Sequence, residues 1–187
     1  MTGRREALVL IDLQKDYFVS DELERCRDDL VAICNRLVRG ARDAGVPVIE
    51  VRTIHLPDRS TWTLTMHEDG QGMVLQGSRG AEPLDGLDTA EALVMTKTRD
   101  SAFFGTDLRQ LLADRSVDHL VLCGVSTESC IAATASDAFA HDLGATLVAD
   151  ATASADRDLH HHTLSQLEIR FRYEVLDADE LLERWRR

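Results

Sequence analysis

The feature that most constrains this chain is an alternation of short apolar runs with longer amphipathic stretches. Apolar runs cover residues 7–13, 46–54, 92–96, 119–123 and 145–149, and a last short run covers residues 173–176. The runs are continuous, which is typical of parallel strands that are buried on both faces. The pattern predicts βα units around a mostly parallel sheet. We therefore expect an α/β fold with a three-layer α/β/α sandwich.

The amphipathic stretches predict helices over residues 23–44, 107–114, 128–143, 159–171 and 178–185. Gly45 supplies a stop signal for the first of them. Residues 55–87 interrupt this alternation of strands and helices with a long segment rich in Gly, Asp and Thr. Long ordered loops of this kind commonly serve a functional site. No composition break or linker divides the 187 residues. We therefore expect one domain over residues 1–187.

The charge and the cysteine content indicate which classes of partner and which cellular compartment to expect. A formal net charge of -12 argues against nucleic acid and against an anionic membrane as partners, because both attract clustered Lys and Arg. The four cysteines lack the C-x-x-C spacing of a zinc site and are too few for a disulfide scaffold. No signal peptide and no membrane-spanning apolar run is found. We expect a soluble, cytoplasmic protein with reduced thiols.

Two charged residues close predicted strands, and ligands of open parallel sheets bind beyond the carboxyl ends of the strands. Asp12 follows the first apolar run, where partial burial would suit it to general-base work. A turn cap or a structural ion pair is the alternative interpretation. Lys97 follows the third run, and beside a carboxylate and a thiol it would favour their anionic forms. An isolated lysine at this position is more commonly a surface residue.

Cys130 ends the segment GVSTESC at residues 124–130, which places a thiol in the first turn of a predicted helix. The free N–H groups and dipole of a helix start stabilise a thiolate. They are also suitable donors to the oxyanion of a tetrahedral intermediate. The alternative is a buried, unreactive cysteine, an interpretation that fits Cys34 and Cys123.

Three segments closely resemble the signature blocks of isochorismatase-like cysteine hydrolases. They are IDLQKDYF at residues 11–18, KTRDSAFFGTDL at residues 97–108 and GVSTESC at residues 124–130. The resemblance covers nearly the whole chain. It includes Asp150 and Ala151 after the fifth strand, and His160 before the penultimate helix.

The resemblance places the family's catalytic triad on Asp12, Lys97 and Cys130, and its oxyanion donors on the backbone amides of Ser126 and Cys130. It also implies a cis peptide bond between Val125 and Ser126. The implied activity is hydrolysis of a small-molecule amide, lactam or ureido substrate through a thioester acyl-enzyme, without a redox or group-transfer cofactor. A homodimer or homotetramer is implied as well.

One stretch of the sequence bears on whether the protein binds a metal. Nicotinamidases in this superfamily hold a metal through an Asp-x-His pair, whereas the corresponding stretch here is Thr53-Ile54-His55. The missing carboxylate argues against a metal and against nicotinamide as substrate, and we expect no metal. His55, Asp58 and His67 could form a weaker site, but exposed loop histidines are the commoner case.

We expect the substrate pocket to be lined by six residues: Phe18, His55, Trp62, Phe103, Ser129 and His160. Aromatic side chains among them would exclude water, and core packing is the alternative for the phenylalanines. The acidic composition slightly favours a cationic substrate such as streptothricin.

Two further functions remain open. One is hydrolysis of the vinyl ether of isochorismate, which relatives carry out without a cysteine nucleophile. The other is a non-catalytic binding module or thiol sensor that uses Cys130 as a reactive switch. A sensor would need a resolving thiol, for which Cys123 is the candidate, and it would not need Asp12 or Lys97.

Overall fold

The computed structural model describes residues 4–187. Its parallel strands form one sheet in the order β3-β2-β1-β4-β5-β6. The strands are β1 (Glu6–Ile11), β2 (Val48–Thr53), β3 (Leu93–Lys97), β4 (His119–Val125), β5 (Gly144–Ala153) and β6 (Glu174–Leu176). The predicted parallel α/β sheet is confirmed.

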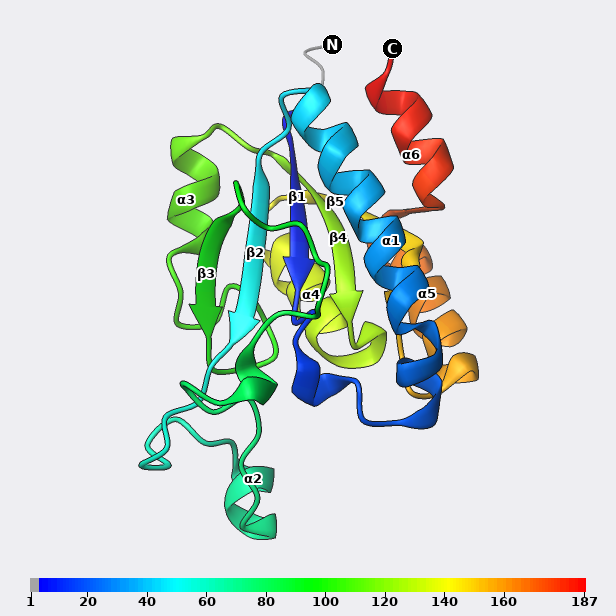
Figure 1. Ribbon diagram of the computed structural model, residues 1–187. Coiled ribbons are helices and arrows are strands. Elements are labelled where there is room, and N and C mark those ends of the chain that lie inside the picture. The colour runs from blue at the N-terminus through cyan, green and yellow to red at the C-terminus, as the bar shows by residue number, and fades with distance from the viewer. Residues whose placement is uncertain (1–3) are drawn as a thin grey trace.

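Helices cover both faces of this sheet. On one face, α1 (Asp21–Asp43) and α6 (Ala178–Trp185) pack on alternate strand residues such as Leu8 and Leu10. On the other face, α3 (Leu108–Asp114), α4 (Ala132–Ala140) and α5 (Arg157–Phe171) pack on Ala7, Val9 and Ile11. Figure 1 shows α1 in front of the sheet and α4 behind it. This is the predicted three-layer sandwich, and the apolar runs are continuous because every strand position of β1 from residue 7 onward faces a core.

The two central strands approach each other closely. A Cβ atom at Gly124 of β4 would lie 1.9 Å from the carbonyl oxygen of Ile11 on β1, and the backbone of Gly124 has a φ of +122°. Only glycine adopts this conformation readily and leaves room for the neighbouring backbone. Gly124 thus allows β4 to lie against the end of β1, directly before Asp12.

Three expected boundaries were wrong. The helix expected over residues 128–143 is a π-helical turn, η3 (Thr127–Ile131), followed by α4, which ends at Ala140. The fifth strand is longer than expected and contains Asp150 and Ala151, because a register irregularity against β4 lets β5 continue to Ala153. The penultimate helix begins at Arg157 and therefore contains His160.

Most of the segment of residues 55–87 lies beyond the carboxyl ends of the strands, and its last residues return along α1, where the carbonyl of Gly86 accepts from Asn35. It contains α2 (Leu64–Asp69) and the short 3-10 helix η2 (Arg79–Ala81), which packs beside η1 (Lys15–Tyr17). In Figure 1 the arrowheads of β1 to β4 point toward this segment, and α2 projects farthest from the sheet. No helix of residues 4–187 is long and apolar enough to cross a membrane.

Candidate active site

The sheet order brings the three predicted catalytic residues together. Asp12 follows β1, Lys97 ends β3, and Cys130 lies in the π-helical turn after β4. Because β2 lies between β1 and β3, the side chain of Lys97 has to reach across the end of β2. Its Nζ lies 2.7 Å from Oδ2 of Asp12 and 3.4 Å from Sγ of Cys130. The three side chains therefore form one contiguous group at the carboxyl edge of the sheet.

This group is removed from water. Asp12 is 0% exposed, Lys97 is 2% exposed and Cys130 is 4% exposed. A buried charge is costly unless it is paired and hydrogen-bonded. Here the carboxylate and the ammonium neutralise each other, so the site holds two charges in a dry region.

The ammonium of Lys97 has three hydrogen bonds for its three N–H groups. Nζ donates to Oγ1 of Thr53 at 2.7 Å, to the carbonyl of Arg99 at 3.0 Å and to Sγ of Cys130 at 3.4 Å. Two of the N–H groups are thus held by fixed acceptors. The third lies between the sulfur and Oδ2 of Asp12, which is 2.7 Å from Nζ.

The two oxygens of Asp12 have different surroundings. Oδ1 accepts from the backbone N–H and from the hydroxyl of Thr53, both at 2.9 Å. Oδ2 is buried and lies 2.7 Å from Nζ of Lys97, a distance at which an ammonium donates to a carboxylate, and the thiol of Cys130 is hydrogen-bonded to the same carboxylate. A carboxylate oxygen has two lone pairs, so Oδ2 can pair with Lys97 and still accept a proton from the thiol.

The thiol of Cys130 is protonated at rest. Burial raises its pKa to about 12, the negative charge of Asp12 adds to this effect, and the positive charge of Lys97 opposes it. Lys97 lowers the pKa of the thiol, as expected of a cation beside it, but loss of hydration has the larger effect. A thiol with this pKa needs a base beside it in order to attack an amide carbonyl efficiently at neutral pH.

The turn that carries Cys130 leaves backbone donors available. The carbonyl of Ser126 accepts from the N–H groups of Ser129 and Ile131, each at 3.2 Å, and within the described residues no bond to it from the N–H of Cys130 is found. The peptide bond between Val125 and Ser126 is cis, as the family resemblance implied. The turn is braced by a 2.8 Å contact between Oγ1 of Thr127 and Nδ1 of His160.

A cavity of about 350 Å³ opens onto Cys130. Two of the six predicted pocket residues, His55 and Ser129, line it, together with Tyr17, Thr53 and further residues from the segment of residues 55–87 and from residues 98–100. Nδ1 of His55 lies 2.9 Å from the carbonyl oxygen of Thr61, and burial lowers the pKa of this histidine. The long segment after β2 thus supplies one wall of the cavity, as expected of a loop that serves a site.

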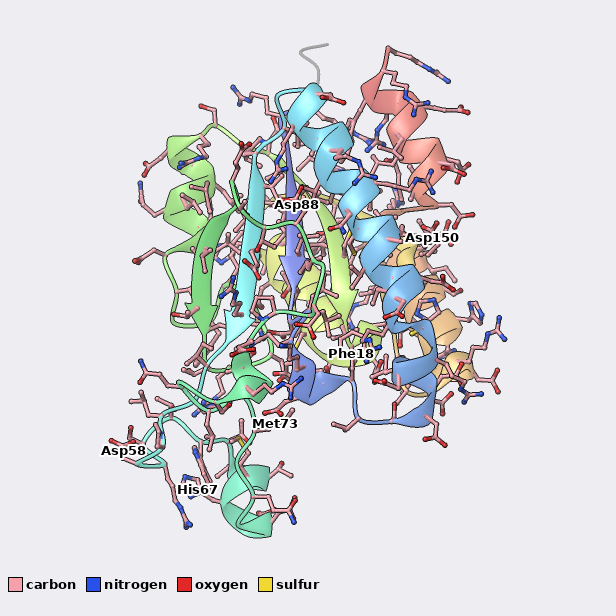
Figure 2. The ribbon with its side chains drawn as sticks, in the orientation of Figure 1. Phe18, Asp58, His67, Met73, Asp88 and Asp150 are labelled. Carbon is pink, nitrogen blue, oxygen red and sulfur yellow. The ribbon has the colours of Figure 1, made fainter. Side chains whose placement is uncertain are left out.

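The other four predicted pocket residues lie elsewhere. Phe18 packs with α1 in the core, and Figure 2 shows it near the amino-terminal end of that helix. Phe103 is buried on the other face of the sheet, with its ring 5.0 Å from that of His141. His160 is half-buried and contacts Thr127 of the π-helical turn. Trp62 lines a neighbouring cavity. For the two phenylalanines, the structure shows the core packing that was the alternative interpretation.

The candidate metal residues do not converge. The carboxylate of Asp58 accepts from the backbone N–H and hydroxyl of Ser60, and the ring of His67 lies 5.7 Å from that of Trp62. Figure 2 shows Asp58 and His67 on the projecting segment, away from the sheet. Within residues 4–187 no group of three or more His, Cys, Asp or Glu side chains could hold one ion. The residues present do not fit the metal of the nicotinamidases.

Sequence reasoning missed three residues of the site: Thr53, Gln14 and Tyr17. Gln14 is buried, accepts from the N–H of Thr53, and donates to the carbonyls of Thr53 and Ala81. Tyr17 lines the cavity, and burial raises the pKa of its hydroxyl. Thr53 closes β2, so the same strand-end rule that selected Asp12 and Lys97 also pointed to it. It was overlooked because threonine, unlike aspartate or lysine, is common in strands.

A carboxylate, an ammonium and a thiol lie together at the carboxyl edge of the parallel sheet, and this site in an α/β sandwich is typical of a hydrolase. The chain belongs to the isochorismatase family: the model of the isochorismatase domain matches residues 6–180.

Relatives of several activities are similar to this chain. A probable inactive nicotinamidase from Arabidopsis thaliana is 35% identical over 84% of this chain and 85% of its own length. A probable isochorismatase from Pseudomonas chlororaphis is 30% identical, over 83% and 75%. A maleamate amidohydrolase from Pseudomonas putida is 28% identical, over 90% and 82%.

A solved structure extends the likeness to the whole fold. The crystal structure of an isochorismatase family protein from Desulfovibrio vulgaris has a TM-score of 0.86 and 30% identity, and the match covers 99% of this chain and 100% of that chain.

Proposed function

We propose that this isochorismatase-family hydrolase cleaves the C–N bond of a small-molecule amide, lactam or ureido substrate, with Cys130 as nucleophile. The observation that carries the proposal is the position of Oδ2 of Asp12. This oxygen is buried and pairs with a lysine that also contacts the thiol, and the thiol is hydrogen-bonded to the same carboxylate. Such an oxygen is suited to receive the thiol proton.

In the first half-reaction, Asp12 takes the proton of Cys130 while the sulfur attacks the substrate carbonyl carbon. Charge develops on the carbonyl oxygen, and the backbone N–H groups of Ser126 and Cys130 are the donors that would stabilise it. Asp12 then returns the proton to the departing nitrogen. The C–N bond breaks, the amine leaves and a thioester remains on Cys130.

In the second half-reaction, Asp12 takes a proton from water, and the resulting hydroxide attacks the thioester. Collapse of the second tetrahedral intermediate releases the carboxylic acid, and the sulfur regains the proton from Asp12. Lys97 remains beside both groups and stabilises negative charge as it moves between oxygen and sulfur. One water is consumed for each C–N bond broken.

Two cavities bear on the size of the substrate. The 350 Å³ cavity at Cys130 adjoins a second cavity of about 610 Å³, and Thr63, Thr65, Arg99 and Asp100 line both. The outer cavity is also lined by Trp62, Leu64 and Phe104. We infer that the reacting amide occupies the inner cavity and that an apolar part of the substrate lies in the outer one.

A substrate panel tests the proposal. Amides, lactams and ureido compounds, including maleamate, nicotinamide and streptothricin, are incubated with the wild type, with Cys130→Ala and with Cys26→Ala, which changes a half-buried thiol on α1. We expect the wild type and Cys26→Ala to release ammonia or amine, and Cys130→Ala to release none. Mass spectrometry of the quenched wild type should detect the acyl group on Cys130. Equal turnover by Cys130→Ala would refute a cysteine nucleophile.

Isochorismatase-type cleavage is the second candidate, favoured by the similarity to the probable isochorismatase. Hydrolysis of a vinyl ether needs no thiol nucleophile. Turnover of isochorismate that survives in Cys130→Ala would therefore support this candidate.

A thiol sensor is disfavoured by the position of the resolving cysteine. Cys123 packs in the core beneath α1, whereas Cys130 belongs to the core on the opposite face of the sheet. A disulfide between them would have to form across β4.

A further inference from the structure

The hydroxyl group of Thr53 lies between the two charged residues of the site. Oγ1 is 2.9 Å from Oδ1 of Asp12 and 2.7 Å from Nζ of Lys97, and Thr53 is buried. An ammonium only donates hydrogen bonds, so the hydroxyl has to accept from Lys97. Its single proton is then directed to Asp12. The direction of both hydrogen bonds, from Lys97 to Thr53 and from Thr53 to Asp12, therefore follows from the chemistry of the three groups.

This direction has a consequence for Lys97. Thr53 and the carbonyl of Arg99 occupy two of its three N–H groups, which leaves the third for Sγ of Cys130. Oδ2 of Asp12 lies 2.7 Å from the same ammonium. Without the hydroxyl, the ammonium could rotate, direct a second N–H at Oδ2 and turn away from the sulfur. Oδ2 would then accept a proton from the thiol less readily.

The hydroxyl also orients the carboxylate. With the backbone N–H of the same residue, it places two donors on Oδ1. The carboxylate is thereby anchored to the end of β2 by one oxygen, and its other oxygen pairs with Lys97. Topology explains why this position is used, because β2 lies between the strands that carry Asp12 and Lys97.

We propose that Thr53 is a positioning residue, whose hydroxyl holds the carboxylate of Asp12 in place to act as base and fixes the ammonium of Lys97 beside Cys130. The catalytic part of this inference rests on the proposed amidohydrolase function. The part that concerns Cys130 does not, because it can be measured on the thiol itself.

The test compares Thr53→Val, which has nearly the same shape without the hydroxyl, with Thr53→Ser, which keeps the hydroxyl. The matched control is Thr146→Val. Thr146 is a buried strand threonine whose hydroxyl also contacts two side chains, His119 and Glu174, but at the amino end of the sheet. We expect Thr53→Val to lower kcat by roughly 10- to 100-fold with little change in KM. Thr53→Ser and Thr146→Val should keep kcat near the wild-type value.

A second readout needs no substrate. The rate at which iodoacetamide alkylates Cys130 at neutral pH is followed by peptide mass spectrometry, which separates this thiol from that of Cys26. We expect Thr53→Val to slow the alkylation of Cys130, because the thiolate loses a directed hydrogen bond, and Thr53→Ser to retain the wild-type rate. If Thr53→Val does not fold, Thr53→Ala serves in its place.

The outcomes distinguish failure of the inference about Thr53 from failure of the proposed amidohydrolase function. Wild-type kcat and alkylation rate in Thr53→Val, or equal losses in Thr53→Val and Thr53→Ser, would overturn the role of the hydroxyl. If the wild type hydrolyses no amide, the proposed function fails, and the alkylation rates alone decide the inference about Thr53.

Discussion

The ammonium nitrogen of Lys97 lies 3.4 Å from the sulfur of Cys130, and neither side chain is more than 4% exposed. This proximity does not produce a resting thiolate, because Asp12 balances the charge of Lys97 and burial raises the pKa of the thiol to about 12. The site is therefore suited to proton transfer during attack.

Replacing the carboxylate should separate turnover from thiol reactivity. In Asp12→Asn the base is lost, so we expect amide turnover to fall by roughly 100-fold or more. The same change removes a negative charge that raises the pKa of Cys130 and leaves Lys97 in place, so alkylation of Cys130 by iodoacetamide at neutral pH should become faster. Parallel assays of hydrolysis and alkylation check this prediction. Slower alkylation together with slower turnover would contradict it.

Removing the ammonium should destabilise the fold as well as stop the reaction. Lys97→Met leaves the carboxylate of Asp12 buried without its cation, which we expect to lower the free energy of unfolding by about 3–5 kcal/mol. Lys15→Met is the control, because Lys15 forms ion pairs with the exposed residues Glu82 and Asp85. Its effect in urea unfolding should be much smaller. Similar losses in the two variants would show that the pair in the site contributes no special stability.

Acid should destabilise the protein through a histidine far from the site. Burial lowers the pKa of His119, at the start of β4, to about 4. Because its pKa in the unfolded chain is near 6.5, its neutral form contributes stability that is complete above about pH 6.5 and is lost as the pH falls through about 4. We expect this contribution to be roughly 3 kcal/mol.

Urea unfolding between about pH 4 and 7 measures this contribution. Burial also lowers the pKa of His55 and His160, so the comparison is with His119→Gln, whose free energy of unfolding should depend less on pH than that of the wild type. Identical pH dependence would show that His119 does not resist protonation.

The outer cavity should affect large substrates only. Phe104 is 63% exposed there, so Phe104→Ser should leave stability nearly unchanged. We expect kcat/KM for an amide with an aryl or alkyl extension to fall by roughly 10-fold, and that for a small amide to stay the same. Ile169→Ser, at an exposed site on α5, is the control and should change neither value. Equal effects of Phe104→Ser on large and small amides would place the extension elsewhere.

Much of the fold followed from local patterns. The apolar runs predicted every strand of the sheet to within a few residues, and the three motif blocks located Asp12, Lys97 and Cys130. The π-helical turn was not predicted, because its residues continue the helical pattern of α4 and the difference lies in which backbone groups pair. Phe18 and Phe103 were misplaced, because an aromatic residue beside a motif suits either a core or a pocket wall.

The sequence by itself determined the class of fold, the family and the three side chains that meet at the candidate site, because apolar periodicity and motif spacing are local properties of the chain. Only the tertiary structure decided that β2 lies between β1 and β3, which places the hydroxyl of Thr53 between Asp12 and Lys97. It also decided the protonation of Cys130. A helix start favours a thiolate, but burial by segments distant in the sequence removes water from the sulfur and has the larger effect.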